Sequence, residues 1–237
     1  MEKNNATPDK IQSPETCKSE PTRTIPSHFS QFTTNQNDEI IFDFDRCLAF
    51  MVERGREQFG NHFRIFPEDH GLIFKLLVYA IRDQENAERL NLNLQKGIML
   101  TGPVGCGKTS LMKLLRFFMV QPETYVIKSC REISFEFIAK GFEVIHKYST
   151  GESRKAYCFD DLGTEQNLKY YGNECNVMAE ILLNRYDQFI ARGTLSHLTT
   201  NLSASEIETF YGNRVRSRMR EMFNLVAFPT ESIDKRK

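Results

Sequence analysis

Short apolar runs alternate with amphipathic stretches along the second half of the chain. The apolar runs cover residues 97–100, 124–127, 156–159, 195–199 and 225–228. Between them, apolar residues recur at helical spacing over 108–119, 133–147, 176–190, 203–211 and 214–222. This alternation predicts an α/β fold built on a mostly parallel sheet.

The first 93 residues have a different pattern. Apolar positions recur at helical spacing over 44–59, and a second helix is predicted from Pro67 to about Arg82. Residues 1–35 are rich in Pro, Ser, Thr, Asn and Gln, which predicts a disordered polar tail, either a tether for a partner or solvated filler. We therefore expect a disordered tail over 1–35, a helical N-terminal segment over 36–93 and an α/β domain over 94–237.

Charge and composition exclude several classes of protein. The 237 residues include 31 Lys and Arg against 31 Asp and Glu, so any surface for nucleic acid must be a local patch. The chain contains no apolar run of about 18 residues, and its polar start lacks the pattern of a secretory signal. The six cysteines are scattered without a Cys-x-x-Cys pair, which favours reduced thiols and a cytoplasmic location.

One motif carries specific chemistry. Residues 102–109 read GPVGCGKT, between a predicted strand and a predicted helix, as a phosphate-binding P-loop requires. The glycines let backbone N–H groups surround phosphates, Lys108 reaches the β- and γ-phosphates, and Thr109 binds Mg²⁺. The predicted ATP-binding residues are Gly102, Pro103, Val104, Gly105, Cys106, Gly107, Lys108, Thr109 and Ser110.

A second, acidic motif follows about fifty residues later. The apolar run 156–159 ends in Asp160 and Asp161. Asp160 is predicted to hold Mg²⁺ together with Thr109, and Asp161 to polarise the attacking water. The alternative is that both acids cap the turn before Gly163.

Two further features bear on hydrolysis. Asn201 follows the apolar run 195–199 and either orients the attacking water or caps the helix that begins near Ser203. Arginines at 214, 216, 218 and 220 lie on a predicted helix, where 214 and 218 share one face. An arginine can stabilise a transferring phosphoryl group, although a solvated basic face is the alternative.

The order of these motifs resembles the DnaC/IstB-like group of AAA+ ATPases, which are helicase loaders and transposition helpers. The resemblance covers about residues 95–230 and includes GPVGCGKTS, YCFDDLG, HLTTNLS and YGNRVRSRMRE. It implies a five-stranded parallel sheet of order 5-1-4-3-2 flanked by helices, without a C-terminal lid domain.

The same resemblance implies roles for individual residues. Asp161 stands where many AAA+ proteins have Glu, and Asn201 matches sensor 1. Arg218 best matches the arginine finger, with Arg214 as the runner-up. These roles imply a homo-oligomer in which one subunit supplies an arginine to the ATP of the next.

Three hypotheses follow. The first is a Mg²⁺-dependent ATPase that acts in DNA replication or transposition and loads or regulates a helicase or transposase on single-stranded DNA. The second is an ATP-switched adaptor with negligible turnover that recruits its partner through the N-terminal segment. The third is a small-molecule kinase. It is the weakest hypothesis, because no lid segment with phosphate-binding arginines is evident.

Several other residues have two interpretations. Lys140, Lys147, Arg154 and Lys155 are candidates for a basic groove for single-stranded DNA, or simply solvate the surface. Ile65 and Phe66 either contact adenine or pack in the core. Phe135, Phe142 and Phe189 are expected in the core rather than as platforms for base stacking.

Overall fold

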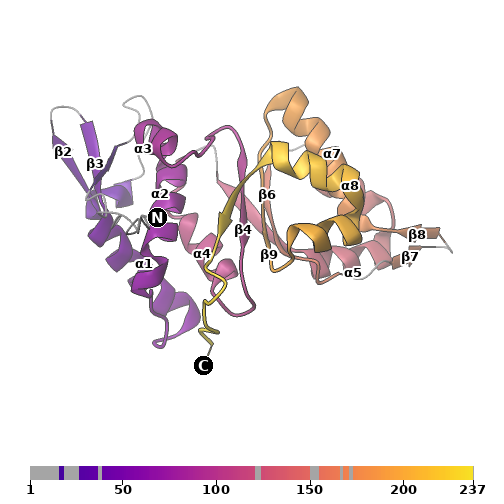
Figure 1. Cartoon of the computed structure of the whole chain (residues 1–237), viewed down its shortest axis with the longest axis horizontal. Helices are drawn as coiled ribbons and strands as arrows, with labels where there is room; N and C mark the ends of the chain where they lie inside the picture. Colours follow the sequence, from indigo (N-terminus) through magenta and orange to yellow (C-terminus); the bar gives the residue numbers. More distant parts are fainter. Residues whose placement is uncertain are drawn as a thin grey trace, which may run out of the picture.

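A five-stranded parallel sheet lies at the centre of the molecule (Figure 1). The computed structural model describes residues 16–18, 27–36, 39–120, 124–149, 155–165, 168–170 and 173–236. The sheet contains β4 (Gly97–Thr101), β5 (Tyr125–Ser129), β6 (Ala156–Leu162), β9 (Ser196–Thr200) and β10 (Phe223–Ala227). Its order is β10-β4-β9-β6-β5, and every neighbouring pair is parallel. The predicted α/β fold and strand order 5-1-4-3-2 are therefore confirmed.

Helices cover both faces of this sheet. One side carries α1 (Phe44–Phe59), α2 (His70–Ile81), α3 (Gln84–Arg89) and α4 (Lys108–Leu115). The other side carries α5 (Cys130–Lys140), α6 (Glu143–Ser149), α7 (Val177–Arg192) and α8 (Ala204–Met222). None of the helices in the described part of the chain is long and apolar enough to cross a membrane.

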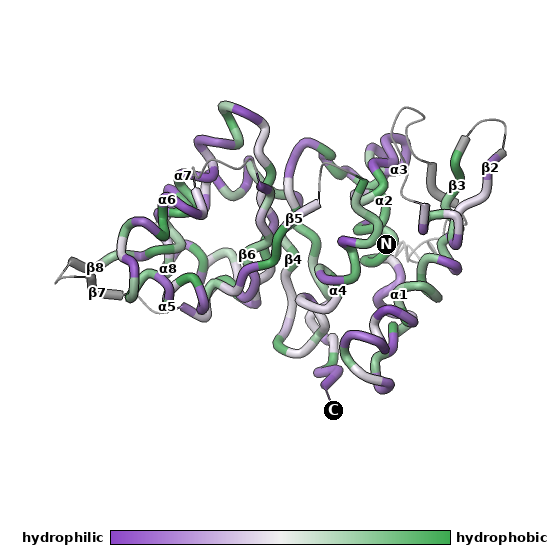
Figure 2. The backbone as a smooth tube through the Cα atoms, turned by 180° about the vertical axis from the view of Figure 1, so that it is seen from behind, coloured by the Kyte–Doolittle hydropathy of each residue, from purple (hydrophilic) through white to green (hydrophobic). Residues whose placement is uncertain are grey.

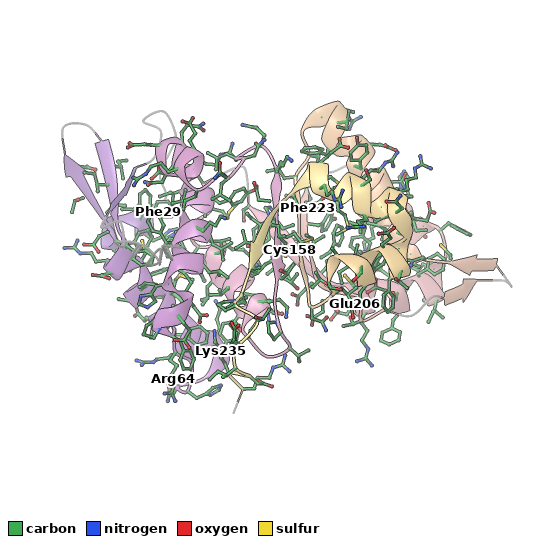
Figure 3. All side chains as sticks on the ribbon, viewed as in Figure 1. Phe29, Arg64, Cys158, Glu206, Phe223 and Lys235 are labelled. Carbon is green, nitrogen blue, oxygen red and sulfur yellow. The ribbon has the colours of Figure 1, made fainter. Side chains whose placement is uncertain are left out.

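The alternation of side chains along each strand divides the core into two clusters. On β4, Ile98 and Leu100 pack with α1, α2 and α4, whereas Met99 packs with the helices of the opposite face. On β6, Cys158 belongs to the first cluster and Phe159 to the second. Figure 3 shows Cys158 at the centre of the molecule, and Figure 2 shows that α2 is predominantly apolar.

Part of the expected disordered tail is folded, which corrects the prediction for residues 27–35. This region forms the 3₁₀ helix η1 (Ser27–Gln31) and strand β2 (Thr33–Gln36). Phe29 and Phe32 are both 0% exposed, and Phe32 lies 4.9 Å from the ring of Phe118 just after α4. Burial of two aromatic rings offsets the entropy lost when this segment becomes ordered. The polar composition of the segment had suggested that this entropy loss would keep it disordered. Residues 1–15 and 19–26 of the predicted tail lie outside the described residues.

Small elements complete the fold. The 3₁₀ helix η2 (Pro67–Asp69) begins the predicted second helix, and the hairpin β7 (Leu168–Tyr170) and β8 (Asn173–Cys175) projects from the α5 side. Strand β3 (Glu39–Asp43) pairs with β1 (Thr16–Lys18) and β2 in a small antiparallel sheet. The expectation of a purely helical segment over 36–93 therefore misses one strand.

Glycines interrupt two of the long helical patterns. The single helix expected over 133–147 is two helices, α5 and α6, because Gly141 adopts a φ of 63°. In α8, Gly212 has non-helical angles, so 203–211 and 214–222 are distinct segments joined at a kink, as predicted. Phe135 and Phe142 are more than half exposed, which corrects their expected place in the core.

Candidate nucleotide-binding site

The P-loop connects β4 to α4 and uses the backbone freedom of its glycines. Gly105 and Gly107 have φ of 81° and 104°, values that other residues adopt only with strain. Lys108 is 6% exposed, and its Nζ donates hydrogen bonds of 2.8 Å to the carbonyl oxygens of Gly102 and Pro103. The loop is therefore built as the motif predicts, with the Lys108 ammonium bound to loop carbonyls.

Below the loop, three side chains converge from three different elements. Asp160 at the end of β6 accepts a 3.0 Å hydrogen bond from the Thr109 hydroxyl at the start of α4. The same carboxylate oxygen accepts a 2.7 Å hydrogen bond from the Thr199 hydroxyl on β9. Thr109 and Asp160 thus meet as predicted, although they are 51 residues apart.

These residues fit Mg²⁺. A hydroxyl and a carboxylate oxygen are the hard ligands that this ion takes in proteins. The pKa of Asp160 is raised from its ordinary value, first by burial, and also by the nearby Asp161 carboxylate. The hydrogen bonds from Thr199 and Thr109 act in the opposite direction. An ion bound beside Asp160 would supply positive charge that favours its ionised form.

Asp161 lies within an irregularity in the sheet. The pairing of β6 with β9 shifts register between Phe159 and Leu162, and Asp161 adopts a φ of 55°. Aspartate tolerates this left-handed conformation better than most residues. Its backbone N–H donates to the Thr199 hydroxyl at 2.9 Å, and its exposed side chain lines the same cavity as Lys108 and Thr109. This position suits the predicted contact with an attacking water.

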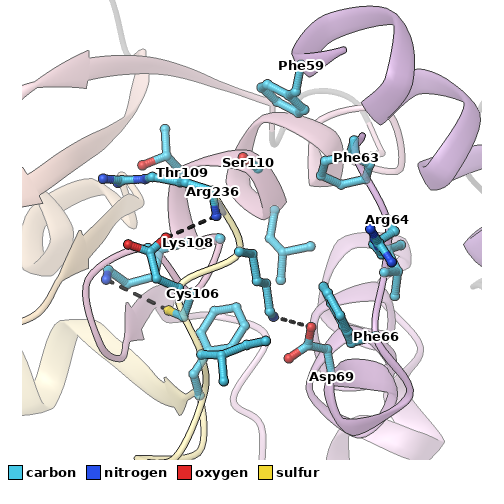
Figure 4. A pocket seen from close by; sticks show the side chains of 18 of the residues that line it. Phe59, Phe63, Arg64, Phe66, Asp69, Cys106, Lys108, Thr109, Ser110 and Arg236 are labelled. Atoms are coloured by element: carbon cyan, nitrogen blue, oxygen red, sulfur yellow. Dashed lines mark hydrogen bonds and ion pairs between the residues drawn. The ribbon is translucent and has the colours of Figure 1, made fainter. Parts of the chain in front are cut away.

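The cavity has a volume of about 550 Å³ and extends from the P-loop to the segment before α2 (Figure 4). The lining includes Ile65 and Phe66, so both residues lie where a base attached to bound phosphates could be reached. Ile65 also packs against the first core cluster. Residues 233–236 near the end of the chain line the cavity too, which sequence reasoning did not anticipate.

The remaining predicted catalytic residues are elsewhere. Asn201 is exposed after β9 and is not part of the cavity lining. Arg218 lies on α8 against α7, 3.7 Å from an Asp187 oxygen and 4.5 Å above the ring of Tyr186. Arg214 is exposed on the same helix. The chain therefore does not bring either arginine to its own P-loop.

The proposed basic groove is partly neutralised. Lys140 and Lys147 both contact Glu136, at 3.4 Å and 2.6 Å. The hydrogen bond from Lys147 is the main cause that lowers the pKa of Glu136 to about 2. Lys155 is exposed at the start of β6, and Arg154 lies outside the described residues. Contact with DNA at these residues stays a prediction.

Sequence reasoning missed Thr199 as a residue of the site. Thr199 is 0% exposed, donates to Asp160 and accepts from the Asp161 amide. A signal was present, because Thr199 ends the run 195–199, which is predicted to lie beside the acidic strand. A buried hydroxyl needs a hydrogen-bond partner, and the adjacent carboxylate is the obvious one.

The chain resembles solved replication proteins in structure at low sequence identity. The DnaC helicase loader is 17% identical, with a TM-score of 0.48 over 70% of this chain and 92% of its own. DnaI is 18% identical, with a TM-score of 0.41 over 58% of this chain and 72% of its own. AMPPCP-bound DnaA from Aquifex aeolicus is 16% identical, with a TM-score of 0.44 over 70% of this chain and 48% of its own. No protein-family model and no curated protein sequence matches the chain.

Proposed function

We propose that this protein is a Mg²⁺-dependent ATPase of the AAA+ type. The observation that carries the proposal is the convergence of Lys108, Thr109 and Asp160 at the carboxyl edge of a parallel sheet. The 3.0 Å contact between Thr109 and Asp160 places two oxygen ligands beside a loop whose lysine is buried. A glycine-rich loop, a lysine, a hydroxyl and an acid in this arrangement are typical of sites that bind a nucleoside triphosphate with its metal ion.

Each residue of the site has a separate role in the proposed hydrolysis of ATP. Lys108 exchanges its bonds to loop carbonyls for the oxygens of the phosphates. Mg²⁺ held by Thr109 and Asp160 would neutralise charge on the β- and γ-phosphates. Asp161 accepts a proton from the attacking water. Thr199 positions both residues, because its hydroxyl donates to the Asp160 carboxylate and accepts from the Asp161 backbone N–H.

The biological role that we propose is loading or regulation of a helicase or transposase on single-stranded DNA. The order of four motifs, including the Thr-Thr-Asn strand end and the arginine-rich helix, supports this assignment. An exposed Arg214 and a surface Arg218 are available to a neighbouring subunit. Self-assembly on DNA would then supply the arginine that the isolated chain does not bring to its own phosphate site.

The test is the steady-state ATPase rate with and without single-stranded DNA, measured at several protein concentrations. We expect a rate per subunit that rises with both DNA and protein concentration. Lys108→Ala is the blank. Lys96→Ala, a half-buried lysine just before β4 at the opposite end of the sheet, is the matched control. A Lys108→Ala rate equal to wild type would refute the ATPase proposal.

An ATP-switched adaptor is the second candidate. The observation in its favour is that Asn201 lies outside the cavity while Arg218 contacts α7 of its own chain. Measurable nucleotide binding combined with turnover near the Lys108→Ala blank, even with saturating DNA, would select the adaptor.

A further inference from the structure

The C-terminal segment, residues 228–236, returns from β10 to the P-loop. Phe228 N–H donates to the Thr101 carbonyl at 2.9 Å, and Lys235 N–H donates to the Gly105 carbonyl at 3.1 Å. The Asp234 carboxylate packs directly on the loop, since a Cβ at Gly105 would lie 2.2 Å from Asp234 Cγ. Figure 4 shows this segment crossing the pocket beside Cys106 and Lys108. Residues 233–236 of this segment therefore form part of the wall of the cavity assigned to nucleotide.

The Lys235 side chain is held by three groups, two from the η2 region and one just after β10. Its ammonium pairs with Asp69 and lies 5.3 Å from the ring centroid of Phe66 and 4.9 Å from that of Phe228. The side chains of Lys235 and Asp69 are only 14% and 5% exposed. Burial strengthens both the ion pair and the cation–π contacts relative to a surface lysine. Figure 3 shows Lys235 at the same end of the molecule as Arg64, which also lines the cavity.

Two features of this arrangement oppose bound nucleotide. The lysine stem crosses the cavity between the P-loop and Phe66, since its Cδ would lie 4.0 Å from a Cβ at Gly107. The Asp234 carboxylate places negative charge against Gly105, where the loop is built to receive phosphates. Steric overlap with the Lys235 stem and repulsion between Asp234 and the phosphates would therefore both lower the affinity for nucleotide.

We propose that the C-terminal segment is an internal competitor of ATP, docked through Lys235 in the slot formed by Phe66, Phe228 and Asp69. This inference rests on the proposed function, because it requires that nucleotide binds at the P-loop. When nucleotide enters, residues 233–236 leave the cavity and become available at the surface. The affinity for nucleotide is lowered by the fraction of molecules in which the segment is docked.

The test is isothermal titration of the full chain with ADP and Mg²⁺, so that hydrolysis does not complicate binding. We expect Lys235→Ala to bind ADP about five- to tenfold more tightly than wild type. Lys235→Arg preserves the charge and should stay within about twofold of wild type. Lys96→Ala is the matched lysine control and should equal wild type.

A second measurement uses the wild-type chain and does not depend on the folding of any variant. Hydrogen exchange of residues 230–236 should accelerate when ADP is added, because the amide of Lys235 loses its bond to Gly105. Lys108→Ala, which lacks the phosphate-binding lysine, should show no such change.

The outcomes separate the two proposals. If ADP binds to wild type and not to Lys108→Ala, while Lys235→Ala binds equally or more weakly than wild type, the competitor proposal is overturned and the nucleotide site stands. Slower exchange of the segment with ADP would also overturn it, since the segment would then be a ligand of the nucleotide. If neither wild type nor any variant binds ADP, both proposals fail.

Discussion

The phosphate-binding edge of the sheet and the arginine-bearing part of α8 differ in how completely one chain builds them. At the sheet edge, Thr109, Asp160 and Thr199 come from three elements and meet within 3.0 Å. On α8, Arg218 contacts α7 through Asp187, Tyr186 and the Leu183 carbonyl. The first region thus joins side chains from three elements of one chain, whereas the arginine of the second lies away from the P-loop.

This difference indicates where control of catalysis can reside. Under the proposed function, the phosphate site of one chain holds the nucleotide, whereas an arginine on a remote surface acts on it only when another molecule brings the two together. Under the proposed function, this separation would make hydrolysis depend on assembly.

The largest expected effect on the ATPase rate comes from Arg218 on α8. Arg218→Ala should lower kcat by about a thousandfold at saturating protein, because an arginine supplied in trans has effects of that order on phosphoryl transfer. Binding of ADP should be unchanged, since Arg218 lies outside the cavity. ATP turnover and ADP titration of the same preparation provide the two measurements, with Arg192→Ala, at the end of α7, as a matched control.

Mixing experiments sharpen this prediction. Lys108→Ala and Arg218→Ala should each have very low activity alone, but a mixture contains interfaces with one intact lysine and one intact arginine. Activity should therefore return in the mixture and should be highest near equal proportions. An Arg218→Ala protein with wild-type kcat would refute the contribution in trans.

An intermediate effect is expected at Thr199. Thr199→Val keeps the shape of the side chain but removes the hydroxyl that donates to Asp160 and accepts from Asp161. We expect kcat to fall about ten- to a hundredfold. Since the hydrogen bond from Thr199 lowers the pKa of Asp160, its loss should move the acid limb of the rate profile to higher pH.

Thr199→Ser provides the control for this role. Serine restores the hydroxyl, so both the rate and the position of the acid limb should approach wild type. If Thr199→Val keeps the wild-type pH profile, Thr199 has only a packing role.

The smallest effect concerns the scaffold beneath the site. His197 is 0% exposed, and its Nδ1 accepts from the Ile98 N–H at 3.1 Å, which joins β9 to β4 below the P-loop. Burial, with a smaller contribution from Arg185, lowers the pKa of His197 from 6.5 to about 3. Below pH 6.5 the unfolded chain binds a proton that the native state does not, so stability decreases as pH falls.

The expected loss of unfolding free energy at His197 is about 1.4 kcal/mol between pH 8 and pH 5.5. Urea unfolding at the two pH values measures it. His197→Asn should be less stable at pH 8 but should lose less stability on acidification, whereas the exposed His62→Asn should behave as wild type. Equal pH dependence in wild type and His197→Asn would contradict the assignment.

Much of the fold follows from local patterns in the sequence. The five strands of the parallel sheet lie where apolar runs predict them, because a strand buried on both faces needs consecutive apolar residues. The P-loop and Asp160 are recognisable because phosphate and Mg²⁺ require particular residue types at particular ends of strands. The folded region around Phe29 and Phe32 could not be predicted this way, since its aromatic rings are stabilised by Phe118, about ninety residues away.

The candidate site divides in the same manner. The sequence by itself predicted the phosphate loop with its lysine, the pair Thr109 and Asp160 proposed as magnesium ligands, and the strand order that the motif resemblance implied. Only the tertiary structure decided that Thr199 bridges Asp160 and Asp161, that Arg218 lies away from the P-loop of its own chain, and that Lys235 enters the cavity beside Asp69. The physical reason is that motifs encode contacts between neighbours in sequence, whereas these contacts join elements whose approach depends on the packing of the whole sheet and its helices.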